Sequence, residues 1–260
     1  MKLFLTQFKN LILRLLSILI IFQFCRLFFF LYNASYFNVT SISEYLFLVY
    51  GSLRFDTSAI LYLNIPLILL SLLPSIKTTI KWYRQTLSFL FITTNLIGIL
   101  LNIFDAFYYQ FSKNRFTISV LDEFANEQSP LKFLLEFLKY YWFMIPIIYL
   151  IFLSLKIISK QTETVVLSYN LTYKNLIISS LLFILSLTLT VFGLRGSFIY
   201  KNRPITISNA GKYAKNPNEI SIIINTPFSI FRTLKYSDLK QIEYFSESII
   251  EDVMPVIKKG

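Results

Sequence analysis

The stretch GSLRFDTSAILYLN, residues 51–64, places two opposite charges beside an apolar run. Arg54 and Asp56 are two positions apart, so on a helix they point in different directions and each needs another partner. A charged side chain near hydrocarbon costs a few kcal/mol and therefore faces protein or water. The two charges thus mark either the end of a membrane helix or a polar site inside a helical bundle.

A later apolar segment carries a polar row at helical spacing. Asn95, Gly98, Asn102 and Asp105 recur at i, i+3, i+7 and i+10, which places them along one helix face. Such a face is predicted to turn inward, because glycine lets a neighbouring helix approach and amides hydrogen-bond between helices. Asn64 is expected to meet Asn95 or Asn102 nearer the middle of the membrane.

These residues predict a polar cluster just inside the outer boundary of the membrane. In it, Asp56 is expected to cap the start of the second membrane helix, and Arg54 is expected to contact Asp105. Three interpretations stay open: mutual satisfaction that holds the bundle together, a recess for a lipid head group, or a docking site for an outer domain. The predicted members are Arg26, Arg54, Asp56, Asn102, Asp105 and Arg115.

Several kinds of chemistry are excluded by the composition. The chain has no histidine, which rules out triads that use one and any metal site that needs imidazole. Its single cysteine, Cys25, lies in an apolar run, so no intrachain disulfide can form. Neither catalytic residues nor a set of metal ligands can be assigned, and we expect no cofactor in this chain.

The overall composition is that of a membrane protein. Hydrophobic residues make up 55% of the 260 positions, charged residues 15%, and the mean hydropathy is +0.59. The formal charge of +11 comes mostly from Lys and Arg that flank apolar runs, where they set membrane topology, so we expect no nucleic-acid partner. The predicted fold class is all-α, a polytopic membrane protein with five transmembrane helices and an extracytoplasmic helical connector.

Five apolar runs are long enough to cross a bilayer, which needs about 20 residues. Basic residues cluster before the first run, between the second and third, and between the fourth and fifth, which predicts that these segments are cytoplasmic. The N-terminus is then inside, and residues 196–260 follow the transmembrane domain (1–195) on the outside. The predicted spans are Leu11–Tyr32, Asp56–Leu73, Leu87–Phe111, Tyr140–Ile158 and Leu176–Leu194.

The connector after the fifth span contains turn signals and short apolar stretches. A cap at Asn218 followed by Glu219 predicts a short helix, and Pro227 is expected to break it or begin another. Amphipathic pattern continues from Tyr236 to Gly260. The connector is predicted to lie on the surface, with four side chains available to the bilayer or to a further domain: Ile222, Ile223, Phe228 and Phe231.

Four motifs in this order resemble the membrane portion of the lipoteichoic acid synthase family, and most closely its sulfatase-like members in Bacteroidetes-type bacteria. The resemblance extends over nearly the whole chain. They are RLFFFLYN (26–33), SLRFDTSAILYLN (52–64), NIFDAFYYQFSKNRFT (102–117) and RPITISNAGKYAKNPNEISIIINTPFSIFRT (203–233).

The resemblance implies five membrane helices followed by an extracellular alkaline-phosphatase-like domain. In such enzymes a threonine nucleophile and a divalent metal, commonly manganese, move phosphoglycerol or a related group from a phospholipid such as phosphatidylglycerol. No threonine in this chain can be assigned as that nucleophile, so we expect a truncated, membrane-anchoring part that is inactive alone and partners a C-terminal sulfatase-like domain. The alternative is a stand-alone five-helix protein, acting as a transport subunit or an assembly partner.

The placement of Lys and Arg generates a topological prediction for the bacterial cytoplasmic membrane. A reporter that is active only in the cytoplasm should be inactive when fused after Gly260, and one that is active only outside should be active there. Fusions after residue 80, in the second connection, provide the control with the opposite pattern. Cytoplasmic activity of the fusion after Gly260 would contradict the predicted orientation.

Overall fold

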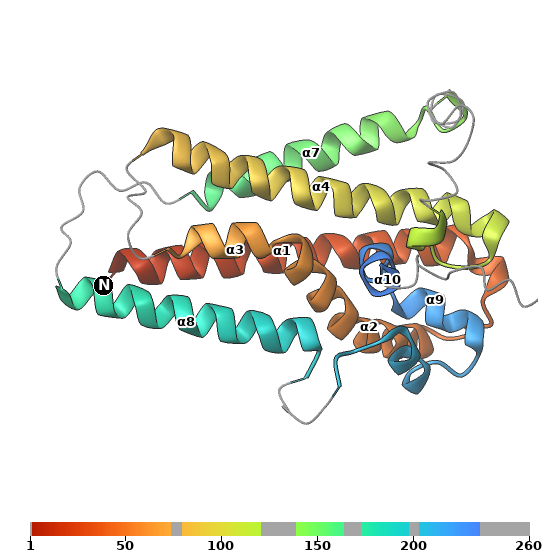
Figure 1. Ribbon diagram of the computed structural model, residues 1–260. Helices are drawn as coiled ribbons and strands as arrows, with labels where there is room; N and C mark the ends of the chain where they lie inside the picture. The colour runs from red at the N-terminus through yellow and green to blue at the C-terminus, as the bar shows by residue number, and fades with distance from the viewer. Residues whose placement is uncertain (1, 74–79, 121–138, 164–172, 198–202, 235–260) are drawn as a thin grey trace, which may run out of the picture.

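Five helices that are long and apolar enough to cross a membrane lie side by side in the computed structural model (Figure 1). The structure describes residues 2–73, 80–120, 139–163, 173–197 and 203–234, and among these it contains helices and no strand. The predicted all-α class is therefore confirmed for the described residues. The long helices are α1 (Lys2–Tyr32), α2 (Ile42–Leu63), α4 (Lys81–Ser112), α7 (Met144–Gln161) and α8 (Tyr173–Arg195).

Helix α1 lies at the centre of the bundle and contacts α2, α4, α7 and α8. Its buried side, including Ile18, Phe22 and Phe29, belongs to one continuous apolar core. The outer helices α7 and α8 are buried only at a few positions, as expected of helices that face lipid on most sides. Four of the five predicted spans thus match observed helices, which extend beyond the predicted limits at one end or both.

The second span differs from the prediction. Helix α2 begins at Ile42 rather than at Asp56, and its cap is Ser41, whose hydroxyl accepts from the amide of Glu44 at 3.2 Å. Glu44 in return accepts from the amide of Thr40, the residue before the cap, at 3.0 Å. Asp56 is therefore not a helix cap. It lies far inside α2 and is fully buried, so its carboxylate must be satisfied by other parts of the protein.

The break after α2 occurs at Asn64, where Pro66 lies in the first turn of the short helix α3 (Ile65–Ser71). Proline fits there because first-turn amides have no partner within the helix. The side-chain amides of Asn64 and Asn95 donate to each other at 2.9 Å, which confirms that contact. Close packing of α2 on α4 depends on Gly98, where an added Cβ would lie 2.5 Å from Leu63 Cδ1.

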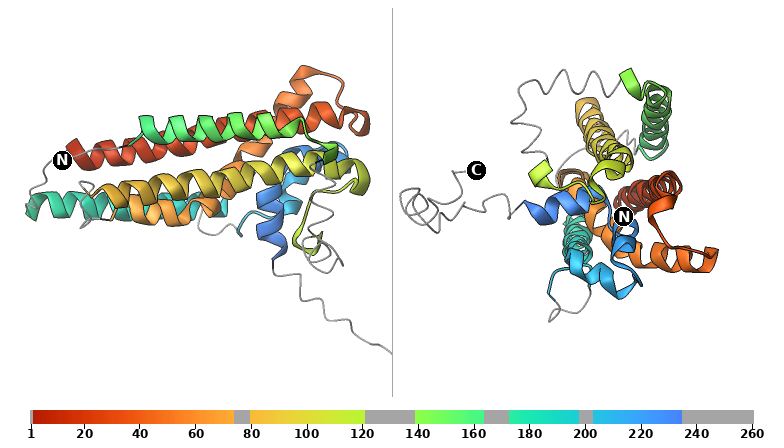
Figure 2. Two further views of the ribbon diagram at one scale, coloured as in Figure 1. Left: turned by 90° about the horizontal axis from the view of Figure 1, so that it is seen from above. Right: turned by 90° about the vertical axis from the view of Figure 1, so that its right-hand side faces the viewer.

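The two ends of the bundle differ in what they carry. The N-terminus of α1 and the beginnings of α4 and α8 lie at one end, on the left of Figure 1. The connector and the beginning of α2 lie at the other end, and α2 runs obliquely to the bundle (Figures 1 and 2). The N-terminus and the connector are therefore at opposite ends, as an odd number of crossings requires.

The described part of the connector forms four short helical elements: η2 (Ile207–Lys212), η3 (Pro217–Glu219), α9 (Ile220–Ile223) and α10 (Thr226–Thr233). The N-cap of η3 is Asn216 rather than the predicted Asn218, because Asn216 and Glu219 form the reciprocal capping bonds. Pro227 lies in the first turn of α10, so it begins a helix, as one of the two expectations had it. The amphipathic pattern from Tyr236 onward lies outside the described residues.

Within the described part of the connector, residues 203–218 are mostly exposed, but residues 219–230 are mostly buried rather than on the surface. Ile222, Ile223 and Phe228 are each 0% exposed and belong to the same apolar core as the long helices, so the expectation that they face the bilayer or a further domain is wrong. Phe228 meets the ring of Phe55 from α2 edge to face, with ring centroids 5.1 Å apart. Phe231 is half-buried against Tyr62. Apolar burial therefore holds α10 against α2 and α4, and α9 against α2 and α1.

Candidate functional site: a buried aspartate clamp

Two aspartates project from neighbouring helices toward the connector. Asp56 comes from α2 and Asp105 from α4, and both are 0% exposed. The row predicted on α4 does turn inward, since Asn95, Asn102 and Asp105 are all buried. A buried carboxylate is tolerated only when it is paired and hydrogen-bonded, so the surroundings of these two residues determine the local structure.

The carboxylate of Asp56, in α2, is bonded to side chains from α1 and from the start of α10. Its Oδ1 pairs with Arg26 Nη2 from α1 and accepts from Asn225 Nδ2 at 2.7 Å. Its Oδ2 accepts from Gln23 Nε2 at 2.5 Å, also from α1. Asn225 is the N-cap of α10, and its own Oδ1 accepts from the amide of Phe228 at 2.9 Å. Asp56 therefore ties α1, α2 and the start of α10 together.

Arg26 extends this contact to the end of α9. Its Nη1 donates to the carbonyl of Ile222 and, at 2.9 Å, to that of Ile223. The last carbonyls of a helix accept no hydrogen bond from within the helix and carry partial negative charge, so a cation beside them is favourable. Arg26 is 3% exposed and thus bridges the α2 carboxylate and the connector backbone away from water.

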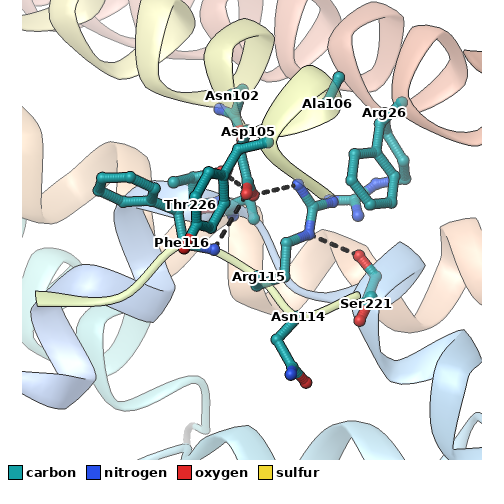
Figure 3. Close-up of polar contacts among 12 residues, drawn as sticks. Arg26, Asn102, Asp105, Ala106, Asn114, Arg115, Phe116, Ser221 and Thr226 are labelled. Atoms are coloured by element: carbon teal, nitrogen blue, oxygen red, sulfur yellow. Dashed lines mark hydrogen bonds and ion pairs between the residues drawn. The ribbon is translucent and has the colours of Figure 1, made fainter. Parts of the chain in front are cut away.

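Asp105 forms the second half of the arrangement (Figure 3). Its Oδ2 accepts from Arg115 Nη1 at 2.8 Å and from Thr226 Oγ1 at 2.7 Å, and its Oδ1 accepts from the amide of Phe116 at 3.0 Å. The amide of Thr226 donates to Asn102 Oδ1 at 3.1 Å. Helix α4 thus holds the first residue of α10 through both its side chain and its backbone.

Arg115 returns from the segment after α4 to lie beside Asp105. Its Nε donates to the carbonyl of Ser221 at 2.7 Å, and its guanidinium lies 3.6 Å from the centroid of the Phe29 ring. Burial lowers the pKa of Arg115, whereas the neighbouring carboxylate of Asp105 acts in the opposite direction. Arg115 therefore repeats the role of Arg26: it joins a helix carboxylate to a carbonyl of α9.

We call this set the aspartate clamp. It contains two carboxylates and two guanidiniums, so its formal charges cancel, and both arginines reach consecutive carbonyls of the connector. The clamp residues are Arg26, Asp56, Asn102, Asp105, Arg115, Asn225 and Thr226.

One predicted member lies elsewhere. Arg54 donates through Nε at 3.0 Å and Nη2 at 2.5 Å to the carbonyl of Gly196, just after α8, and through Nη1 to Tyr213 Oη at 3.4 Å. The expected contact between Arg54 and Asp105 is wrong, because Asp105 is paired with Arg115. The reason is the early start of α2, which places Arg54 on a different face from Asp56. The other five predicted members do come together.

Sequence reasoning missed the connector residues of the clamp. Asn225 precedes Thr226 and Pro227, a pattern typical of a helix N-terminus, but nothing in it indicates that the cap also donates to a carboxylate in α2. Gln23 was also missed, although it lies three residues before Arg26 on the same helix face. The contacts with α9 are to backbone carbonyls and leave no mark in the side-chain sequence.

The geometry argues against some uses of this site. Among the described residues, no three His, Cys, Asp or Glu side chains are placed to hold a metal ion. The space bordered by Arg26, Asn102, Arg115 and Asn225 is too small to hold a water molecule. Both guanidiniums already bond to the chain's own carboxylates and carbonyls. The closed arrangement therefore favours docking of a segment over a recess for a lipid head group.

Comparison of the chain with models of protein families, with curated proteins and with solved structures finds no match. Support for a function therefore comes from the clamp itself and from the four motifs that resemble the lipoteichoic acid synthase family.

Breaking one half of the clamp should cost more than neutralising both of its charges. Asp105→Asn leaves Arg115 buried without its counter-charge, and we expect a loss of about 3 kcal/mol in detergent unfolding. The double variant Asp105→Asn/Arg115→Gln should recover part of that loss, a clear non-additivity. Trypsin should also cut the connector faster in the single variant.

A surface ion pair supplies the control. Lys215 binds Glu44 with its side chain 75% exposed, so Lys215→Gln should change stability much less. Additive effects of the Asp105 and Arg115 substitutions, together with unchanged cleavage of the connector, would contradict the clamp.

Proposed function

We propose that this chain is the membrane domain of an enzyme similar to the lipoteichoic acid synthases, and that the aspartate clamp fixes the connector against its helices. In this proposal the domain lies in the bacterial cytoplasmic membrane with the N-terminus inside. A sulfatase-like domain outside transfers phosphoglycerol, or a related group, from a phospholipid such as phosphatidylglycerol.

The proposal depends on two buried ion pairs, Arg26–Asp56 and Arg115–Asp105. Their arginines donate to three consecutive carbonyls of α9. A flexible tether has no need of such contacts, because buried charges are costly unless every partner is in place. A rigid exit from the membrane is useful to an enzyme whose substrate head groups lie at one fixed depth, since catalysis depends on held geometry. The clamp thus supplies positioning, not chemistry.

The roles in the reaction are divided accordingly. The described part of this chain contributes neither a nucleophile nor metal ligands to the proposal. The threonine and the divalent metal, commonly manganese in the family, belong to the sulfatase-like domain. What the chain contributes is an anchor in the lipid that contains the substrate, and a connector held in one orientation above it.

The proposal is tested by joining a sulfatase-like phosphoglycerol transferase domain after residue 260 and reconstituting the fusion in vesicles of phosphatidylglycerol. We expect manganese-dependent turnover of the lipid, reduced at least several-fold by Asp105→Asn because the clamp no longer orients the connector. Turnover of a water-soluble phosphodiester by the same preparations should not change, since that substrate needs no fixed depth.

Lys215→Gln is the matched control and should behave as the unsubstituted fusion does. Equal lipid turnover with and without Asp105→Asn would contradict the positioning role. A fusion that cleaves the soluble phosphodiester but never the lipid would contradict the proposed family relationship.

A further inference from the structure

Besides the two arginines of the clamp, a third buried arginine lies at the opposite end of the bundle. Arg14 of α1 is 6% exposed; its Nε donates to Thr162 Oγ1 at 2.7 Å and its Nη2 to the carbonyl of Ser159 at 3.2 Å. These bonds cap the C-terminal end of α7, and the guanidinium also lies 5.3 Å from the centroid of the Phe91 ring. Its Nη1 makes no hydrogen bond to the described part of the chain.

Arg14 borders a small polar cleft between α1, α3, α4 and the end of α7. The cleft has an internal volume of about 40 Å³, and Gln7, Arg84, Thr162 and Glu163 are also among its walls. Arg84 Nε pairs with Glu163 Oε1 at 2.7 Å, and the two side chains are 20% and 38% exposed. Arg14, Arg84 and Glu163 thus border the same cleft, and these three residues have a formal excess of one positive charge.

The level of the cleft is that of the membrane surface. Thr162 is the C-cap of α7 and Arg84 lies in the first turn of α4, so both neighbouring helices end or begin here. Trp82, in the same turn as Arg84, is 64% exposed, and tryptophan is enriched where hydrocarbon meets head groups. Phospholipid phosphates occupy this depth.

We propose that this cleft binds the phosphate group of a phospholipid in the leaflet at the N-terminal end of the bundle. Arg14 and Arg84 are the ligands, because planar guanidiniums match phosphate oxygens in charge and geometry. The Glu163 carboxylate occupies the position of those oxygens in the lipid-free protein and is displaced toward water when the phosphate enters. The proposal is independent of the clamp and of the sulfatase-like domain.

Native mass spectrometry of the detergent-solubilised chain with added lipid tests the site. Phosphatidylglycerol should be retained, and diacylglycerol, which lacks the phosphate, should not. Arg84→Gln should weaken retention about tenfold, the equivalent of one charge-assisted hydrogen bond. Glu163→Gln should strengthen it, because the competing carboxylate is gone. Lys9→Gln, an exposed position on the same helix as Arg14, removes the same charge outside the cleft and should leave retention unchanged.

The variants also separate this site from a purely structural role of Arg14. Arg14→Gln removes the cap of α7 and destabilises the fold whether or not lipid binds, so the decisive variants are Arg84→Gln and Glu163→Gln. Retention that is the same in these two as in Lys9→Gln would overturn the proposal, as would equal retention of diacylglycerol. Inorganic phosphate that stabilises the chain as strongly as the lipid does would overturn the lipid as the source of the phosphate.

Discussion

Two carboxylates buried between helices are the constraint on which the connector end of this protein depends. Asp56 and Asp105 are each 0% exposed, and burying a carboxylate is costly unless a cation and further hydrogen-bond donors lie beside it. Arg26 and Arg115 provide the cations, while Gln23, Asn225 and Thr226 complete the hydrogen bonds. Two of these donors belong to the connector, so satisfying the carboxylates requires that the connector be docked.

The same contacts explain why such a short segment is ordered against the bundle. Helix α9 has only four residues, too few to be stable alone, but its final carbonyls bond to Arg26 and Arg115. Ile222, Ile223 and Phe228 add apolar burial to the same interface. The hydrogen bonds and ion pairs therefore fix the position of the connector, and the burial of apolar side chains stabilises it there. A connector held in this way keeps a fixed orientation relative to the long helices.

Much of the bundle could be predicted from the sequence, because apolar runs near 20 residues are a strong signal and the inward row on α4 follows from helical periodicity. The start of α2 could not be placed by hydropathy, since Gly51, Ser52 and Arg54 interrupt the run. The available signal was the Ser-x-x-Glu pattern of Ser41 and Glu44, which is typical of a helix N-terminus. The docked connector was beyond reach for a physical reason: its key acceptors are backbone carbonyls, and its pairing with α2 and α4 links residues more than one hundred positions apart.

Amide hydrogen exchange in lipid nanodiscs tests directly whether the clamp holds the connector in place. The amide of Thr226 donates to Asn102, and that of Phe228 to Asn225, both within the buried interface. We expect peptides covering residues 220–233 to exchange slowly, and Asp105→Asn to speed their exchange while α8 is unaffected. Exchange of residues 220–233 in the unsubstituted chain at the rate of an unstructured peptide would show that the clamp does not hold the connector.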